Sequence, residues 1–312
     1  MIENKKPKIA ISIGDLNGIG IEIALKCHEE ISNICQPIYC INNKMLKKAS
    51  NELKIEIPKS FEIFKTKGEF EIKPGTVSKK SGKYSYDSFL DAINLANKKE
   101  VEAICTLPIN KEAWNKADIK YKGHTEVLRD YFGEDAIMML GCSSMFVALF
   151  TEHIPLKKVA KKIVEENLTK FLIDFYNNVK SDNIAVLGLN PHASDNGVLG
   201  DEEIEIFKAI KKANKFLDKN IFKGPLVPDT AFSPNSRKNH KYFIAMYHDQ
   251  GLAPLKALYF DESVNISLNL PIIRTSVDHG TAFNIAYKNE DINTQSYINA
   301  IKEAINLIHI KK

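Results

Sequence analysis

The chain has 312 residues, of which 44% are hydrophobic and 26% are charged, and these fractions are typical of a globular protein rather than a disordered one. Lysine and arginine total 43 against 39 acidic residues, and a net charge of +4 is too small to indicate nucleic-acid binding. The uncharged central stretch 137–150 is shorter than the roughly 20 apolar residues that a membrane span needs. We therefore expect neither a nucleic-acid nor a membrane partner.

The beginning of the chain and its cysteines indicate a compartment. The first residues contain no apolar segment of the kind that directs secretion, and the five cysteines form no Cys-x-x-Cys pair. Unpaired thiols are typical of a reducing environment. We expect a cytoplasmic protein.

Short apolar runs alternate with segments of helical periodicity along the chain. Strands are predicted at 9–13, 38–41, 101–107, 145–150, 184–189 and 242–246, and helices at 19–31, 86–97, 156–179, 202–217 and around 298–308. The charged, turn-rich stretch 54–82 is predicted to be a peripheral ribbon or arm. This alternation predicts an α/β fold with a largely parallel sheet, and because no linker is visible, two domains would have to share that sheet or be connected more than once.

Three histidines follow three of the predicted strands: His153, His192 and His248. Ligands of open α/β sheets gather at the carboxyl ends of the strands, and three neutral imidazoles suit Zn²⁺ or another divalent ion. The alternative is three unrelated loop histidines that bond to the backbone. No short metal motif such as HExxH decides between the two.

Other polar residues leave two interpretations open. The glycines at 14, 18 and 20 match neither a dinucleotide-binding nor a P-loop pattern, so they mark a tight turn with or without a ligand. Arg274, one of only three arginines, follows an apolar stretch and needs an anion, which is either a protein carboxylate or a substrate phosphate or carboxylate. The turn 278–282 suits an adenine or ribose, or simply a loop cap.

Six segments, taken together and in order, resemble the 4-hydroxythreonine-4-phosphate dehydrogenase family of vitamin B6 biosynthesis. They are Gly14-Asp-Leu-Asn-Gly-Ile-Gly20, Leu107-Pro-Ile-Asn-Lys111, Gly123-His-Thr-Glu126, Leu189-Asn-Pro-His-Ala193, Tyr247-His-Asp-Gln-Gly-Leu252 and Arg274-Thr-Ser-Val-Asp-His-Gly-Thr-Ala282. The chain departs from the family pattern at Leu16 and Asn17, where Pro and Ala are favoured, and at Phe283 and Tyr287.

The resemblance implies a two-lobed α/β/α fold like that of isocitrate and isopropylmalate dehydrogenases, not a Rossmann fold. One lobe would comprise 1–118 and 286–312, and the other, 119–285, would carry the metal, substrate and dimerisation surfaces. The active site would lie in the cleft between the lobes, at the subunit interface of a homodimer.

The resemblance also implies roles for individual residues. The ligands of a divalent metal (Zn, Mg or Co) would be His153, His192 and His248. The substrate-binding residues would be His124, Thr125, Lys256, Asn265 and Arg274. The NAD(P)-binding residues would be Asp278, His279, Gly280, Thr281, Ala282 and Asn284. Candidates for the general base are Asp249 and Lys111.

The implied reaction is the NAD(P)-linked oxidation of 4-phosphohydroxy-L-threonine to 2-amino-3-oxo-4-(phosphooxy)butanoate, which decarboxylates to 3-amino-2-oxopropyl phosphate. One alternative keeps the chemistry but uses D-threonate or D-erythronate 4-phosphate. A remoter alternative is a phosphotransacetylase-like acyl- or phosphate-binding protein. A three-histidine metal site favours the dehydrogenase, because acyl transfer needs no such site.

Overall fold

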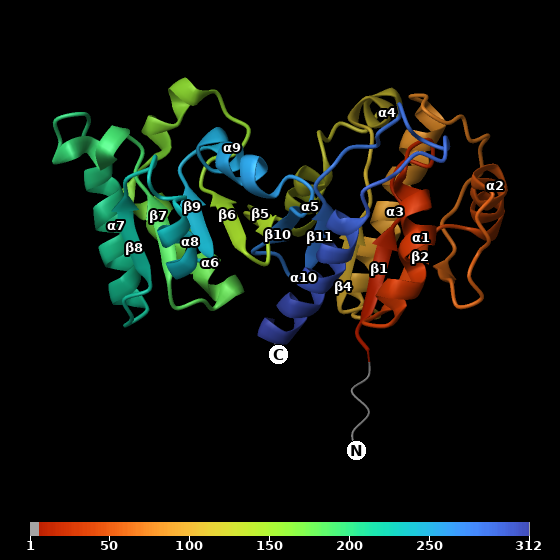
Figure 1. Ribbon diagram of the computed structural model, residues 1–312, viewed down its shortest axis with the longest axis horizontal. Coiled ribbons are helices and arrows are strands. Elements are labelled where there is room, and N and C mark those ends of the chain that lie inside the picture. Colours follow the sequence, from red (N-terminus) through yellow and green to blue (C-terminus); the bar gives the residue numbers. More distant parts are fainter. Residues whose placement is uncertain (1–5, 312) are drawn as a thin grey trace, which may run out of the picture.

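A single eleven-stranded sheet with helices on both faces forms the body of the computed structural model, which describes residues 6–311 (Figure 1). The strands are β1 (Lys8–Ser12), β2 (Gln36–Cys40), β3 (Glu62–Phe64), β4 (Ala103–Thr106), β5 (Ile137–Cys142), β6 (Met145–Leu149), β7 (Ile184–Leu187), β8 (Phe222–Leu226), β9 (Tyr242–Ala245), β10 (Val264–Leu268) and β11 (Arg274–Val277). The helices are α1 (Gly20–Ser32), α2 (Asn43–Leu53), α3 (Lys79–Asn97), α4 (Lys111–Lys116), α5 (His124–Phe132), α6 (Glu165–Val179), α7 (Glu202–Phe216), α8 (Pro234–Asn239), α9 (His248–Tyr259) and α10 (Gln295–Lys311). Among these residues, no helix has both the length and the apolar character needed to cross a bilayer.

The sheet consists of two parallel halves that run in opposite directions. Its strand order is β3-β2-β1-β4-β11-β10-β5-β6-β9-β7-β8. The first five strands in this order (β3, β2, β1, β4 and β11) pair in parallel, and so do the last four (β6, β9, β7 and β8). Between these two groups, β10 is antiparallel to β11 and to β5, and β5 is antiparallel to β6. The prediction of an α/β fold with a largely parallel sheet is confirmed. The reversal at the centre was not predicted.

Successive side chains of a strand point to opposite faces of the sheet and pack against the two helical layers in turn. In β1, Ile9 and Ile11 join a hydrophobic cluster with residues of α1 and α10, while Ala10 between them joins a cluster with Phe89 of α3 and Trp114 of α4. The same alternation occurs in β6, whose odd-numbered residues join a cluster with α9 on one face. Burial of both faces produces the α/β/α layering.

Two predicted elements differ from the structure. Helix α3 begins at Lys79 rather than at 86, after the Ser78 side chain accepts a hydrogen bond from the Ser81 N–H at 3.0 Å. The predicted helix 156–179 is divided: two short 3₁₀ turns precede α6, because Ile163 and Val164 adopt extended backbone, which β-branched residues favour. The stretch 54–82 lies at the sheet edge and contributes only β3 to it.

Candidate active site

A cavity of about 1050 Å³ is lined by residues from both halves of the sheet. Its walls come from the central strands, the segments around α4 and α5, and helices α6 and α9. Every residue predicted to bind substrate lines it, together with two predicted metal ligands, one base candidate and the first part of the predicted cofactor loop: His124, Thr125, Lys256, Asn265, Arg274, His153, His248, Lys111, Asp278, His279 and Gly280.

Arg274 supplies a buried positive charge to this cavity. Arg274 is the first residue of β11 and is only 3% exposed. The guanidinium donates to Thr106 Oγ1 at 2.8 and 3.2 Å, to Asn265 Oδ1 at 3.0 Å and to Ser267 Oγ at 3.1 Å. Burial lowers its pKa to about 10, which leaves it protonated at neutral pH. The four hydrogen bonds orient the cation but do not neutralise it.

His124 begins α5 directly after Gly123 and lies edge-on against two aromatic rings. Its ring centroid is 4.6 Å from that of Phe89 and 5.6 Å from that of Trp114. Burial, with the nearby cations Arg274 and Lys111, holds the pKa of His124 well below its usual range, so the imidazole is neutral. Its Nε2 atom is buried and has no hydrogen-bond partner within residues 6–311, which leaves it available to a ligand.

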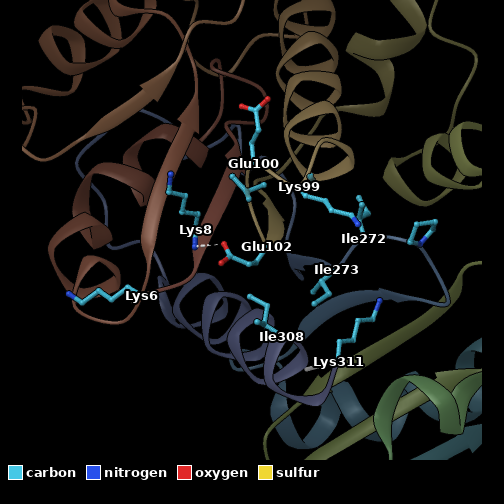
Figure 2. A pocket seen from close by; sticks show the side chains of 12 residues that line it. Lys6, Lys8, Lys99, Glu100, Glu102, Ile272, Ile273, Ile308 and Lys311 are labelled. Atoms are coloured by element: carbon cyan, nitrogen blue, oxygen red, sulfur yellow. Dashed lines mark hydrogen bonds between the residues drawn. The ribbon is translucent and has the colours of Figure 1, made fainter. Parts of the chain in front are cut away.

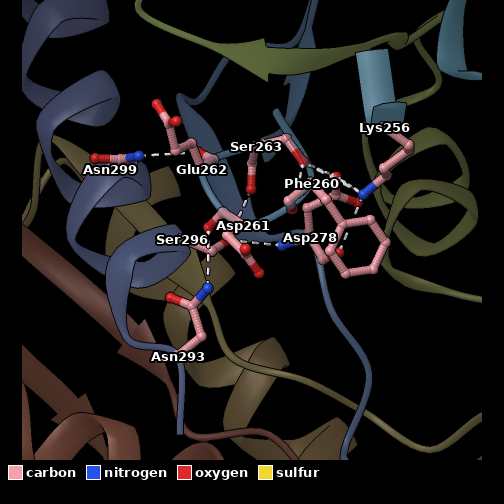
Figure 3. A network of polar contacts seen from close by, with 9 residues as sticks. All are labelled: Lys256, Phe260, Asp261, Glu262, Ser263, Asp278, Asn293, Ser296 and Asn299. Atoms are coloured by element: carbon pink, nitrogen blue, oxygen red, sulfur yellow. Dashed lines mark hydrogen bonds and ion pairs between the residues drawn. The ribbon is translucent and has the colours of Figure 1, made fainter. Parts of the chain in front are cut away.

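Lys256 is held by a polar network that joins α9, the turn before β10 and the start of α10 (Figure 3). Its ammonium group pairs with the Asp278 carboxylate and donates to Ser263 Oγ at 3.2 Å. The Asp278 N–H donates to Ser296 Oγ at 3.0 Å, and the Ser296 hydroxyl donates to the Ser263 carbonyl at 2.8 Å. In contrast to Arg274, Lys256 therefore has a carboxylate partner within the protein.

Two of the three predicted metal ligands lie side by side. The ring centroids of His153 and His248 are 5.4 Å apart, and His248 Nδ1 donates to Asp249 Oδ1 at 2.7 Å. A carboxylate on Nδ1 fixes the tautomer and leaves Nε2 free to bind a metal ion. These two imidazoles fit part of a divalent-metal site. They owe their proximity to β6 and β9 being adjacent parallel strands that end at the same edge.

His192 does not join this pair within one chain. It follows β7, lies on an exposed turn with a left-handed φ of 53°, and does not line the cavity. In the described part of the chain, no group of three or more His, Cys, Asp or Glu side chains is placed to hold a metal ion. The predicted set of three ligands is thus not assembled by a single chain.

The predicted cofactor loop continues out of the cavity toward the glycine turn. Thr281, Ala282 and Asn284 do not line the cavity, but the Thr281 carbonyl accepts from the Ile19 N–H at 3.1 Å. A Cβ on Gly18 would lie 2.7 Å from that carbonyl oxygen, so only glycine permits this close approach. The glycine turn therefore packs against the predicted cofactor loop.

Residues that depart from the family pattern bond the glycine turn to other neighbouring segments. The fully buried Asn17 holds the turn at 73–76, because its side chain accepts from the Lys73 N–H at 2.9 Å and donates to the Thr76 carbonyl at 2.8 Å. The Tyr287 hydroxyl donates to the Leu16 carbonyl at 2.8 Å.

The base candidates are placed differently. Lys111 begins α4, capped by Asn110, whose side chain accepts from the Ala113 N–H at 2.8 Å, and it lines the cavity. The side chain of Asp249 is 84% exposed, does not line the cavity and is bonded to His248. Sequence reasoning did not identify Thr106 or Ser267, because each lies in a strand where a small polar residue carries no motif.

A second hollow of about 550 Å³ contains none of the predicted site residues (Figure 2). Its walls include lysines, two glutamates and three isoleucines, Ile272 and Ile273 from the segment before β11 and Ile308 from α10. The Glu102 carboxylate there accepts from the Lys8 N–H at 2.8 Å. The larger cavity is therefore the candidate active site.

In its fold and site, the molecule is an α/β enzyme whose cavity suits a small anionic substrate. The model of the family described as pyridoxal phosphate biosynthetic protein PdxA matches residues 33–304. The chain is 64% identical to a 4-hydroxythreonine-4-phosphate dehydrogenase of Sulfurimonas denitrificans over 97% of this chain and 98% of that protein. It is 61% identical to one of Campylobacter fetus over 96% of this chain and 98% of that protein. The chain belongs to the pyridoxal phosphate biosynthetic protein PdxA family.

Solved structures agree with this assignment. A 4-hydroxythreonine-4-phosphate dehydrogenase from Klebsiella pneumoniae superposes with a TM-score of 0.81 at 30% identity, over 97% of this chain and all 100% of that one. A phosphotransacetylase from Streptococcus pyogenes superposes with a TM-score of 0.55 at 12% identity, over 97% of this chain and 95% of that one. The second likeness concerns the fold alone.

Proposed function

We propose that this chain is a metal- and NAD(P)-dependent dehydrogenase that oxidises 4-phosphohydroxy-L-threonine. The observation that carries the proposal is the single cavity that joins the buried cation Arg274 to the adjacent imidazoles of His153 and His248. A buried cation and a pair of imidazoles in one cavity suit a substrate with a phosphate and a secondary alcohol. Family membership supports the same reaction.

We assign the phosphate, the metal ion and the cofactor to different residues of the site. Arg274 and Lys256 would bind the phosphate, and Asn265, His124 and Thr125 would supply directional hydrogen bonds. His153 and His248 would hold a divalent ion, which, when bound, acts as a Lewis acid that lowers the pKa of the substrate hydroxyl. The loop Asp278–Asn284 would bind NAD(P), the hydride acceptor.

Lys111 is the base candidate that the cavity favours, because Asp249 lies outside it and is bonded to His248. To accept the hydroxyl proton, the Lys111 ammonium would first have to release a proton of its own. Removal of the hydroxyl proton and a hydride would give 2-amino-3-oxo-4-(phosphooxy)butanoate. This β-keto acid would then lose CO₂ and take up a proton at the same carbon to give 3-amino-2-oxopropyl phosphate.

The placement of His192 favours a homodimer with the site at the subunit interface. His192 is exposed and outside the cavity of its own chain, so we propose that the partner subunit's His192 completes the metal site. We further propose lobes of 1–118 with 286–312 and of 119–285, and a cytoplasmic location, which the five buried free cysteines support.

The test is an assay of NAD⁺ and NADP⁺ reduction with 4-phosphohydroxy-L-threonine. We expect turnover that a chelator abolishes and that Zn²⁺, Mg²⁺ or Co²⁺ restores. D-threonate and D-erythronate 4-phosphates are run in parallel, and a preference for either would keep the mechanism and change the substrate. Absence of turnover with all three substrates after metal addition would overturn the dehydrogenase assignment and leave the acyl- or phosphate-binding alternative.

A further inference from the structure

The acceptors around Arg274 are all uncharged and come from strands on both sides of it. Thr106 is the last residue of β4, and Ser267 stands directly opposite Arg274 in the pairing of β10 with β11. Asn265 precedes Ser267 on the same face of β10. Thr106 is 0% exposed and Ser267 is 2% exposed, so water does not replace these contacts.

A buried guanidinium normally has a carboxylate partner, because a lone charge is costly to remove from water. Here no Asp or Glu of the described chain forms an ion pair with Arg274. The charged groups that act on its neighbour His124 are Arg274 itself and Lys111, both cations. The surroundings therefore leave a positive charge uncompensated until an anion enters the cavity.

We propose that Thr106 and Ser267 are positioning residues, which hold the Arg274 guanidinium in one orientation while leaving its charge available for the substrate phosphate. Thr106 Oγ1 accepts from both Nε and Nη2, which determines the plane of the guanidinium, and Ser267 Oγ accepts from Nη1 on the other side. Neutral acceptors orient without competing with a phosphate, whereas a carboxylate would form the stronger charge-assisted bond and occupy the cation. This inference rests on the proposed function, which places phosphate at Arg274.

The first test replaces Thr106 with valine, which keeps the shape of the side chain but removes the acceptor. Because hydrogen bonds to a charged group are the stronger kind, we expect the KM for 4-phosphohydroxy-L-threonine and the Kd for inorganic phosphate to rise about tenfold or more. The KM for NAD⁺ should not change, and Thr106→Ser should restore the wild-type values. The matched control is Thr275→Val on β11, which is equally buried but makes no hydrogen bond to Arg274.

The second test adds the carboxylate that the site lacks. We expect Ser267→Asp to weaken phosphate binding about tenfold or more relative to the uncharged variant of matching shape, Ser267→Asn, without a lower melting temperature. A purely structural role would instead reduce stability and binding together. Equal phosphate affinities for the Asp and Asn variants, or an unchanged KM for Thr106→Val, would overturn the inference.

The wild-type protein separates this inference from the proposed function. If the wild type neither turns over 4-phosphohydroxy-L-threonine nor binds inorganic phosphate, the proposed function fails and the inference with it. If the wild type does both and the variants match it, only the inference about Thr106 and Ser267 fails.

Discussion

Asp15 is fully buried, and its carboxylate oxygens accept hydrogen bonds from the Asn17 N–H at 3.0 Å and the Ser81 hydroxyl at 3.1 Å. Within the described residues no cation pairs with it. Burial raises the pKa of Asp15 to about 6, because removing the charged form from water outweighs the two hydrogen bonds. The carboxyl thus introduces a pH dependence at the turn that packs against the predicted cofactor loop.

This shift predicts how stability changes with pH. Since the folded protein retains a proton on Asp15 that the unfolded chain loses near pH 4, the free energy of unfolding should fall as pH rises from about 4 to about 6 and then level off, by at most about 3 kcal/mol. Asp15→Asn should lack this fall and be more stable than the wild type above pH 6. The measurement is the free energy of unfolding of both proteins in urea at pH 4.5 and pH 8. If the free energies of unfolding of the two proteins differed by the same amount at both pH values, the prediction would be contradicted.

Helices α3 and α4 meet at a glycine, close to Lys111 at the start of α4. Gly82 of α3 lies so close to α4 that an added Cβ would be 2.2 Å from the Ala113 carbonyl oxygen. The Trp114 indole N–H donates to Ser85 Oγ at 2.8 Å across the same contact. Alanine is normally the better helix residue, by about 1 kcal/mol, so this glycine reflects packing rather than helix propensity.

We expect Gly82→Ala to destabilise the protein by about 1–3 kcal/mol, because the backbone of α4 must move to make room for the methyl group. The measurement is the free energy of unfolding in urea. Gly123→Ala is the control, since a Cβ there would have nothing within 4 Å. A Gly82→Ala protein as stable as the wild type would show that α3 and α4 separate at little cost.

The reversal of direction at the centre of the sheet shapes the whole molecule. Because β5 and β10 are antiparallel to their neighbours, β6, β9 and β7 run opposite to β1 and β4. The strand order then places β9 between β6 and β7. His153 and His248 thus follow adjacent strands, whereas His192 follows the next strand out and lies on an exposed turn.

Subunit mixing tests whether the partner subunit's His192 completes the site. We expect His153→Ala and His192→Ala proteins to be inactive alone but to recover about a quarter of the wild-type rate when unfolded, mixed and refolded together, since half of the dimers then contain one intact site.

The control is a mixture of His153→Ala with His248→Ala, which should stay inactive because one chain supplies both residues to a site. No recovery in the first mixture, with mixed dimers detected by native mass spectrometry, would place His192 in the site of its own chain.

Much of the architecture could be read from local patterns. The apolar runs that became β1, β2, β4, β6, β7 and β9 were predicted because strands buried on both faces need continuous apolar side chains. Helix α10 was predicted from its spaced isoleucines, of which Ile298, Ile301 and Ile308 are buried. The residues predicted to bind substrate line one cavity. They were predicted from short motifs that resemble those of a family, and such motifs can be recognised without knowledge of the fold.

The sequence by itself determined six of the strands, several of the helices, the family and the types of residue in the site, because these depend on local periodicity and short motifs. Only the tertiary structure decided which groups meet. It separated His192 from His153 and His248, paired Lys256 with Asp278, and surrounded Arg274 with neutral acceptors from β4 and β10. Each of these outcomes depends on strand order and register, which bring together residues far apart in the chain and which no local pattern encodes.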